Sequence, residues 1–313
     1  MKQRYSILLM LSAACLFSAC SNDDDAEETK NPPLVIHVSE TPMTNDGALA
    51  QAVSHRGAIV NNTNFNTFYM RYGNEDTYSY RVTKSENTWS ANYSSPGAGR
   101  NTFYAFSDGS FQWNGGNPYV HFAVDENIPN QKDLLAAIDA DVTGYEVNLS
   151  FKHICSAVQF KICKTTEMTA YEIVVNDAVL CNVVKEGDYY FKGDSWTLGS
   201  TKTSYTLNTA PFTLGTTPTN LDAASGTEYL FMIPQTLTAW DKTAITQSTP
   251  GSYLRLNCTI KKGSDYAPDY STNAYAYLPV GGTWIKDTKH VITLKVGTAL
   301  RNASGKKITE ILP

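Results

Sequence analysis

Apolar and polar residues alternate with a period of two along most of this chain, the pattern of strands that bury one face. Val120, Phe122 and Val124, for example, fall on one side of a short segment. Stretches rich in Gly, Pro, Asn and Asp, such as NGGNP at 114–118, separate these segments and favour turns. Only 133–138 (DLLAAI) is expected to form a helical turn. Many short strands without a long helix predict an all-β fold. The expected strands are 34–38, 65–72, 78–83, 102–106, 119–124, 171–175, 178–184, 203–208, 228–233, 253–260, 274–278 and 288–296.

Two segments depart from simple alternation. In 146–163 the apolar residues occupy odd positions up to 151 and even positions from 154 onward. A strand cannot change its buried face without an extra residue or a break, so we predict a β-bulge or crossover near His153. The segment 229–233 (YLFMI) is apolar on both faces and is expected to be a central strand covered on both sides.

The N-terminus resembles a bacterial lipoprotein signal. Lys2 and Arg4 precede an apolar run over 7–17, which is too short to span about 30 Å of hydrocarbon. The run leads into LFSAC, in which small residues allow cleavage and the Cys20 thiol can accept a diacylglycerol. The mature chain then starts at a lipidated Cys20. The alternative is an ordinary signal peptide with a coincidental cysteine.

An acidic run, SNDDDAEE at 21–28, follows Cys20. Such a run cannot bury apolar surface, so it indicates a flexible tether. It is also similar to the signal that sends lipoproteins to the surface of one Gram-negative phylum, and a plain linker is the alternative. The residues assigned to this signal are Asp23, Asp24 and Asp25. The expected organisation is a signal peptide (1–19), a lipidated tether (20–33), an N-terminal domain (34–150) and a C-terminal domain (151–313).

Composition further limits the classes of function that are possible. The formal net charge is −5 and no stretch is strongly basic, which argues against nucleic acid as a partner. Of the later cysteines, Cys155 and Cys163 are too far apart on one strand to form a disulfide. Cys163 and Cys181 can pair if their strands are neighbours, and Cys258 alternates with apolar residues as a buried free thiol does. The cysteines lack CxxC spacing, so no zinc site is expected.

No catalytic motif is present: there is no GxSxG, HExxH or phosphate loop. Asp139 and Asp141 could hold a cation, although such a pair is more often a solvated loop. His153 could act as a general base, but no nucleophile is identifiable near it, and a satisfied, partly buried histidine at the strand break is the more frequent case. We therefore expect a protein that is not an enzyme and that has no metal or cofactor. The tryptophans could form a sugar-stacking platform, which leaves a surface carbohydrate-binding lipoprotein as the alternative function. They are Trp89, Trp113, Trp196, Trp240 and Trp284.

The order of several short motifs resembles the fimbrillin-like (Mfa-like) family of surface lipoproteins. The most specific match is DLLA at 133–136, followed by VNLSFKH at 147–153 and SAVQF at 156–160. LFMIPQ at 230–235 is also similar, whereas TKH at 288–290 departs from the aromatic pair usual in the family. The resemblance implies two transthyretin-like β-sandwich domains in an outer-membrane lipoprotein that assembles with other subunits into fimbriae, as stalk, anchor or tip.

In characterised members of this family, a protease cuts after an N-terminal Arg, releases a first strand and opens a groove. A strand from the next subunit fills that groove. In this sequence the corresponding cut site is Arg56. The alternative is that the first strand is permanent and nothing is cut. The removable strand would be Leu34, Val35, Ile36, His37 and Val38. The donor strand would include Ile308, Ile311 and Leu312.

The lipoprotein hypothesis is directly testable. Replacing Cys20 with Ala is expected to abolish lipidation and membrane anchoring, because no other apolar segment is long enough to hold the chain in a bilayer. Metabolic labelling with a clickable fatty acid, followed by membrane fractionation, measures both. A Cys20→Ala protein that still carries the label would contradict the hypothesis.

Overall fold

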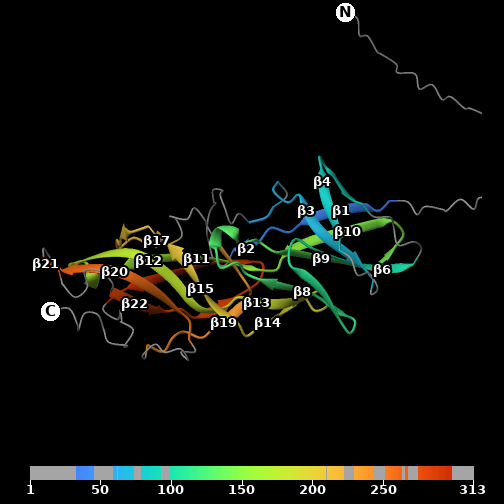
Figure 1. Ribbon diagram of the computed structural model, residues 1–313. Coiled ribbons are helices and arrows are strands. Elements are labelled where there is room, and N and C mark those ends of the chain that lie inside the picture. Colours follow the sequence, from blue (N-terminus) through green and yellow to red (C-terminus); the bar gives the residue numbers. More distant parts are fainter. Residues whose placement is uncertain are drawn as a thin grey trace, which may run out of the picture.

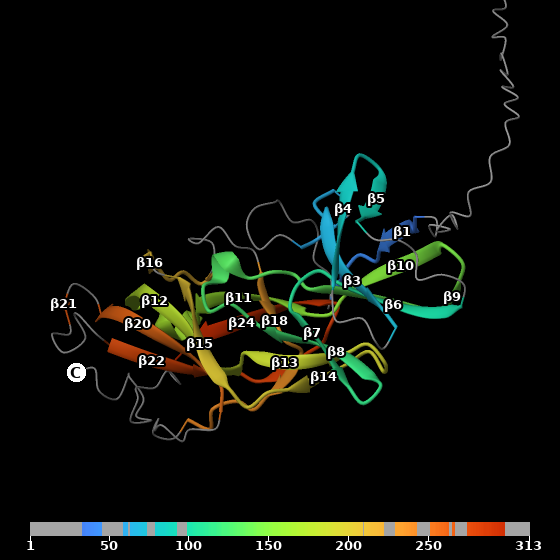
Figure 2. The ribbon, with the colours of Figure 1, turned by 45° about the vertical axis from the view of Figure 1, so that its right-hand side comes forward.

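The computed structural model describes residues 33–45, 59–61, 63–73, 79–92, 99–208, 210–221, 229–242, 251–262, 265–266 and 274–297. Strands dominate this part of the chain, which has no α-helix and only the short 3₁₀ helices η1 (Ile128–Asn130) and η2 (Thr166–Met168). The all-β prediction is confirmed. No helix among these residues combines the length and apolarity needed to cross a bilayer. The strands form an elongated molecule with a barrel at one end and two larger sheets at the other (Figures 1 and 2).

Seven strands close into an N-terminal barrel in the order β1-β10-β9-β6-β3-β4-β5. The alternating residues that point inward form one hydrophobic core, in which Phe68, Val82, Val147 and Phe151 are fully buried. The period-two alternation of apolar residues in the sequence therefore predicts which residues form this core. The barrel strands are β1 (Val35–Glu40), β3 (Thr67–Tyr72), β4 (Tyr80–Ser85), β5 (Thr88–Ala91), β6 (Arg100–Phe106), β9 (Leu135–Thr143) and β10 (Glu146–His153).

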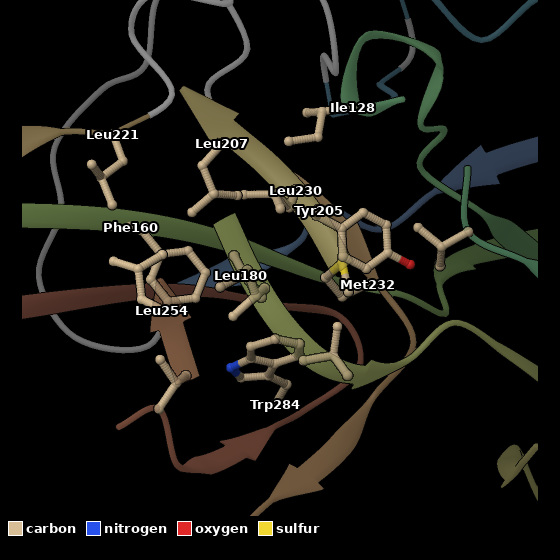
Figure 3. Packing of buried hydrophobic residues seen from close by; sticks show 14 of the residues in the cluster. Ile128, Phe160, Leu180, Tyr205, Leu207, Leu221, Leu230, Met232, Leu254 and Trp284 are labelled. Atoms are coloured by element: carbon tan, nitrogen blue, oxygen red, sulfur yellow. The ribbon is translucent and has the colours of Figure 1, made fainter. Parts of the chain in front are cut away.

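Two sheets in the C-terminal half share a second, larger core. Figure 3 shows Phe160, Leu180 and Leu254, from three different strands, gathered in it. One sheet contains β2 (Thr44–Asn45), β11 (Ser156–Lys164), β17 (Thr219–Asn220), β18 (Leu230–Met232) and β24 (Thr288–Val296). The other contains β12 (Tyr171–Val184), β15 (Lys202–Asn208), β16 (Phe212–Thr213), β20 (Tyr253–Lys262), β21 (Asp265–Tyr266) and β22 (Ala274–Pro279). β18 is buried on both faces, as predicted for 229–233, but among the described strands it pairs only with β11, so it is not the expected central strand.

A smaller sheet connects the two halves. Its order is β14-β13-β8-β7, so it takes two strands from each side of residue 150. The assignment of each half to a transthyretin-like sandwich, divided after residue 150, stays a prediction. This sheet contains β7 (Ser110–Asn114), β8 (Asn117–Ala123), β13 (Glu186–Tyr190) and β14 (Ser195–Leu198), and a separate pair contains β19 (Gln235–Leu237) and β23 (Gly282–Trp284).

The break predicted near His153 is confirmed. β10 of the barrel ends at His153, and β11, which belongs to a different sheet, begins at Ser156. Up to that point exposed and buried residues alternate, whereas β11 starts with five buried residues. The change in parity marks the place where the chain leaves one sheet and enters another.

The helical turn expected at 133–138 is wrong, because β9 begins at Leu135. Leu135 and Ala137 lie in the barrel core, whereas Leu134 and Ala136 lie in the larger core. Both faces of this segment are therefore covered. A short run that is apolar on both faces cannot be distinguished from a buried helical turn by periodicity.

All four described cysteines are buried and free. Cys163 and Cys181 do not form the disulfide that their spacing left open, and Cys258 is the buried thiol expected from its pattern. Burial raises the pKa of Cys258 to about 12, so its reactive thiolate form is scarce at neutral pH.

Phe151 is expected to be essential for the barrel, because its ring packs edge-on against Phe65 and Phe68 with both centroids 4.9 Å away. Phe151→Ala should lower the free energy of unfolding by about 3–5 kcal/mol. Asn148→Ala, at an exposed position of the same strand, should change it by less than about 0.5 kcal/mol. Urea unfolding of the three proteins tests this, and equal effects of the two substitutions would contradict it.

Candidate functional site at the first strand of the barrel

β1 is held unequally by its two neighbours. On one side it pairs in parallel with β10 over its whole length, from Val35 opposite Glu146 to Glu40 opposite Phe151. On the other side a single antiparallel pair joins Ile36 to Trp89 of β5. β1 therefore closes the barrel, but almost all of its backbone pairing is with one neighbour.

The side chains of β1 alternate as the sequence predicts. Ile36 is 6% exposed, and Leu34 and Val38 are partly buried against the barrel core, whereas Val35 and His37 face solvent. The predicted strand 34–38 is thus shifted slightly, since β1 begins at Val35 and ends at Glu40. The strand presents a row of apolar residues inward at every second position, followed by Glu40 at the next inward position.

Aromatic rings make up much of the core beside β1. Trp89, opposite Ile36, has its ring centroid 5.2 Å from that of Phe68 and 5.4 Å from that of Phe65. Phe151, opposite Glu40, contacts the same two phenylalanines. Large rings in tilted and edge-on contact bury much apolar area, so this core would be costly to expose to water.

Glu40 ends β1 in a buried ionic cluster. The His153 side chain is fully buried; its Nε2 lies 3.0 Å from Oε1 of Glu40 and its Nδ1 lies 2.8 Å from Oδ2 of Asp133. The side chains of Glu40 and Asp133 are 3% and 0% exposed. These three residues are called the junction cluster below. A neutral imidazole can donate from only one nitrogen, so two ionised carboxylates facing both nitrogens favour the protonated ring.

The electrostatics of the cluster agree with this geometry. Burial by itself lowers the pKa of His153, but hydrogen bonding and Coulomb attraction from Asp133, then Glu40 and Asp287, outweigh it, so the pKa of His153 is raised. Burial raises the pKa of Asp287, an effect that His153 partly offsets. The folded protein therefore favours a positive charge on His153.

Beyond Glu40 the chain crosses to the C-terminal half. The Thr41 N–H donates to the Phe151 carbonyl at 3.0 Å, and the Thr44 N–H donates to the Asp287 carbonyl at 2.9 Å. Met43 is buried in a small cluster that includes Phe231. β2 then pairs in parallel with the start of β24. The segment 35–45 is therefore bonded to the barrel and to a C-terminal sheet.

A sequence model described as fimbrillin-like matches residues 43–310. This chain belongs to the fimbrillin-like family. The match begins just after β1 ends at Glu40. It covers the last three residues of the bridging segment 35–45, together with all the later strands.

Several solved structures align with this chain. A fimbrial protein from Bacteroides vulgatus aligns with a TM-score of 0.51 at 17% identity, covering 76% of this chain and 92% of that protein. A candidate cell adhesion protein from Bacteroides eggerthii gives a TM-score of 0.47 at 13% identity and covers 90% of each chain. One from Bacteroides ovatus gives 0.44 at 13% identity, covering 87% of this chain and 96% of that one. No curated protein matches the chain.

Several residues predicted for this fimbrillin-like chain lie outside the described residues and stay predictions. They are Cys20, Asp23, Asp24, Asp25, Arg56, Ile308, Ile311 and Leu312. Asp139 and Asp141 are described and do not act together: Asp139 accepts from the Asn148 N–H at 2.6 Å, and Asp141 lies 3.7 Å from Arg100. No group of three or more His, Cys, Asp and Glu suited to a metal occurs in the described ranges.

The five tryptophans do not form an exposed platform for sugars. Trp89, Trp240 and Trp284 are buried in the cores. Trp113 and Trp196 are partly buried against the larger core, and Nε1 of Trp196 donates to the Ile154 carbonyl at 2.7 Å. These side chains therefore contribute mainly to packing.

Sequence reasoning predicted a satisfied, partly buried histidine at 153 but missed its partners, and the structure buries the side chain fully. Glu40 carried a usable signal, because it shares the even parity of Leu34, Ile36 and Val38 and is thus an acid on the buried face. Asp133 carried none, since it was assigned to a helical turn.

The raised pKa of His153 predicts a pH-dependent stability. A raised folded-state pKa stabilises the fold fully below the ordinary histidine pKa of about 6.5, and this stabilisation is lost as pH rises through the folded-state pKa. The wild type should therefore lose stability relative to His153→Gln as pH rises from below about 6.5 through the folded-state pKa of His153. The other charged groups around His153, namely Glu40, Asp133, Asp287 and, beside Asp287, Lys152 and Lys286, are common to both proteins.

Urea unfolding at several pH values measures this difference. The NMR titration of the His153 ring in the wild type provides a readout that does not depend on the variant folding. A ring that titrates at or below the ordinary histidine range would contradict the prediction.

Proposed function

We propose that this fimbrillin-like chain is a surface lipoprotein, anchored through Cys20, whose first strand is replaced during assembly by a strand from another subunit. Membership of the family supports a fimbrial or adhesin role at the cell surface and suggests a non-enzymatic protein. Its partners are then other fimbrial subunits, and its location is the outer membrane.

The proposal rests on how β1 is paired within the barrel. β1 is paired to β10 over six residues and to β5 at one position, and neither neighbour is adjacent to it in sequence. Its loss would break no hairpin, but it would leave one edge of β10 unpaired and expose the aromatic core beside Trp89. An apolar groove flanked by an unpaired strand edge binds an added strand through backbone hydrogen bonds and alternate side chains.

Arg56 has a suitable position in the sequence for releasing this strand. It follows both β1 and β2, so a single cut after Arg56 separates the whole segment 35–45 from the rest of the chain. The donor proposed within this sequence is the C-terminal segment that contains Ile308, Ile311 and Leu312. In a filament, that segment of one subunit would occupy the place of β1 in the next.

Limited trypsin treatment of the purified precursor, followed by size-exclusion chromatography, tests the proposal. The cut chain is expected to form ladder-like oligomers, because an exposed apolar groove is covered by a partner strand. Arg56→Gln should block the cut and keep the chain monomeric. Deletion of 306–313 should permit the cut but prevent the ladder if this segment is the donor.

A chain that is cut after Arg56 and stays monomeric in the full-length form would contradict self-polymerisation. Such a result would leave the role of a tip or anchor subunit, or of an adhesin that acts as a monomer.

A further inference from the structure

The junction cluster joins a residue that stays with the barrel to a residue that leaves with β1. Asp133 precedes β9 and also accepts from the Val60 N–H at 2.9 Å, so it is held by the body of the protein. Glu40 is the last residue of β1. If β1 leaves, His153 keeps Asp133 and loses the acceptor at its Nε2.

An apolar strand would not replace that acceptor. It could fill the positions of Leu34, Ile36 and Val38, but it would bury the Nε2–H of a protonated His153 without a partner. An unpaired buried donor, above all a charged one, costs the free energy of removing it from water. The end of the groove therefore discriminates among strands by charge as well as by apolar shape.

We infer that the groove left by β1 selects a strand that carries a carboxylate opposite Phe151, two residues beyond the last of its three inward apolar side chains. The pattern is apolar-x-apolar-x-apolar-x-acid, in parallel with β10. This inference rests on the proposed exchange of β1 and names the chemistry of the strand that replaces it.

The register of β1 supports the pattern. Ile36 lies opposite Val147, Val38 opposite Leu149 and Glu40 opposite Phe151. A slip of one residue would turn Ser39 toward His153 and the apolar row toward solvent. The intervening residues Val35, His37 and Ser39 are exposed, so the groove places little restriction on them.

The C-terminal segment of this chain matches the pattern only in part. In parallel register, an acid at the place of Glu40 requires Glu310, which puts Ile308 at the place of Val38 and Lys306 at the place of Ile36. Ile36 is buried, so Lys306 is a poor substitute there. The pattern therefore predicts that a strand with the β1 sequence binds more tightly than the chain's own C-terminal segment.

Peptide exchange on the cleaved full chain tests the inference. A specific protease site is inserted after Arg56, the chain is cut, and fluorescent peptides with the sequence of residues 33–45 are exchanged into the groove. Relative affinities follow from polarisation. Against the natural sequence, E40Q should bind about 10-fold and E40L about 100-fold more weakly, because a hydrogen bond to a charged group is replaced by a neutral one or by none. His37→Gln, a polar change at an exposed position, is the matched control and should bind as the natural peptide does.

The pH dependence of peptide binding distinguishes recognition of the carboxylate charge from recognition of side-chain shape. The preference for Glu over Gln at position 40 should shrink as pH rises through the pKa of His153, because a neutral ring that donates to Asp133 presents a lone pair to the strand. The surrounding charged groups of the protein are the same for the Glu40 peptide and the E40Q peptide. They are Asp133, Asp287, Lys152 and Lys286. A host chain carrying His153→Gln should show no preference.

The outcomes distinguish the two hypotheses. Exchange of the natural, E40Q and E40L peptides with equal affinity would overturn the inference and leave the proposed function standing. A preference that does not change with pH would also overturn the inference, because shape alone would then explain it. A cut chain that exchanges no peptide, the natural one included, would overturn the proposed function and the inference together.

Discussion

The buried contact of His153 with Glu40 and Asp133 is the interaction on which the junction of the two halves depends. It draws one residue each from the end of β1, the end of β10 and the segment before β9. Buried ion pairs are weak evidence for stability, since removing the charges from water can cost more than their attraction returns. What such a cluster does supply is register: Glu40 reaches His153 only when the apolar row of β1 faces inward. The cluster and the hydrophobic alternation therefore specify the same alignment by independent physical means.

β1 differs from the other barrel strands in its connections. The strands β3, β4 and β5 follow one another as antiparallel neighbours, and so do β9 and β10. Contacts of this kind are local and form without a large loss of chain entropy. β1 pairs instead with a strand more than 100 residues later in the sequence. Most of the barrel thus consists of units that do not need β1 to form, which is what a replaceable strand requires.

The sequence predicted local features well and distant contacts poorly. The change of parity at His153 is a property of neighbouring residues, so the break between β10 and β11 was visible in it. In β12 the segments 171–175 and 178–184 were expected as separate strands, whereas they form one strand with a register shift between Val175 and Asp177. A bulge interrupts alternation without ending a strand, and periodicity cannot tell the two apart. The partners of His153 lie 20 and 113 residues away, so no local pattern connects them.

The segment 35–45 contacts both halves of the molecule, so the loss of β1 would affect both. Immediately after Glu40 it buries Met43 beside Phe231 and pairs β2 with β24. Asp287, whose carbonyl accepts from Thr44, also attracts the charge of His153. Withdrawal of the segment would therefore remove an acid from His153, a side chain from a C-terminal cluster and a strand from the edge of β24. A replacement that supplied only the apolar row would fill the barrel core and leave all three of these contacts unmade. Under the proposed exchange, full replacement would require a longer donor, with its acid at the point where the strand passes from the barrel to the sheet.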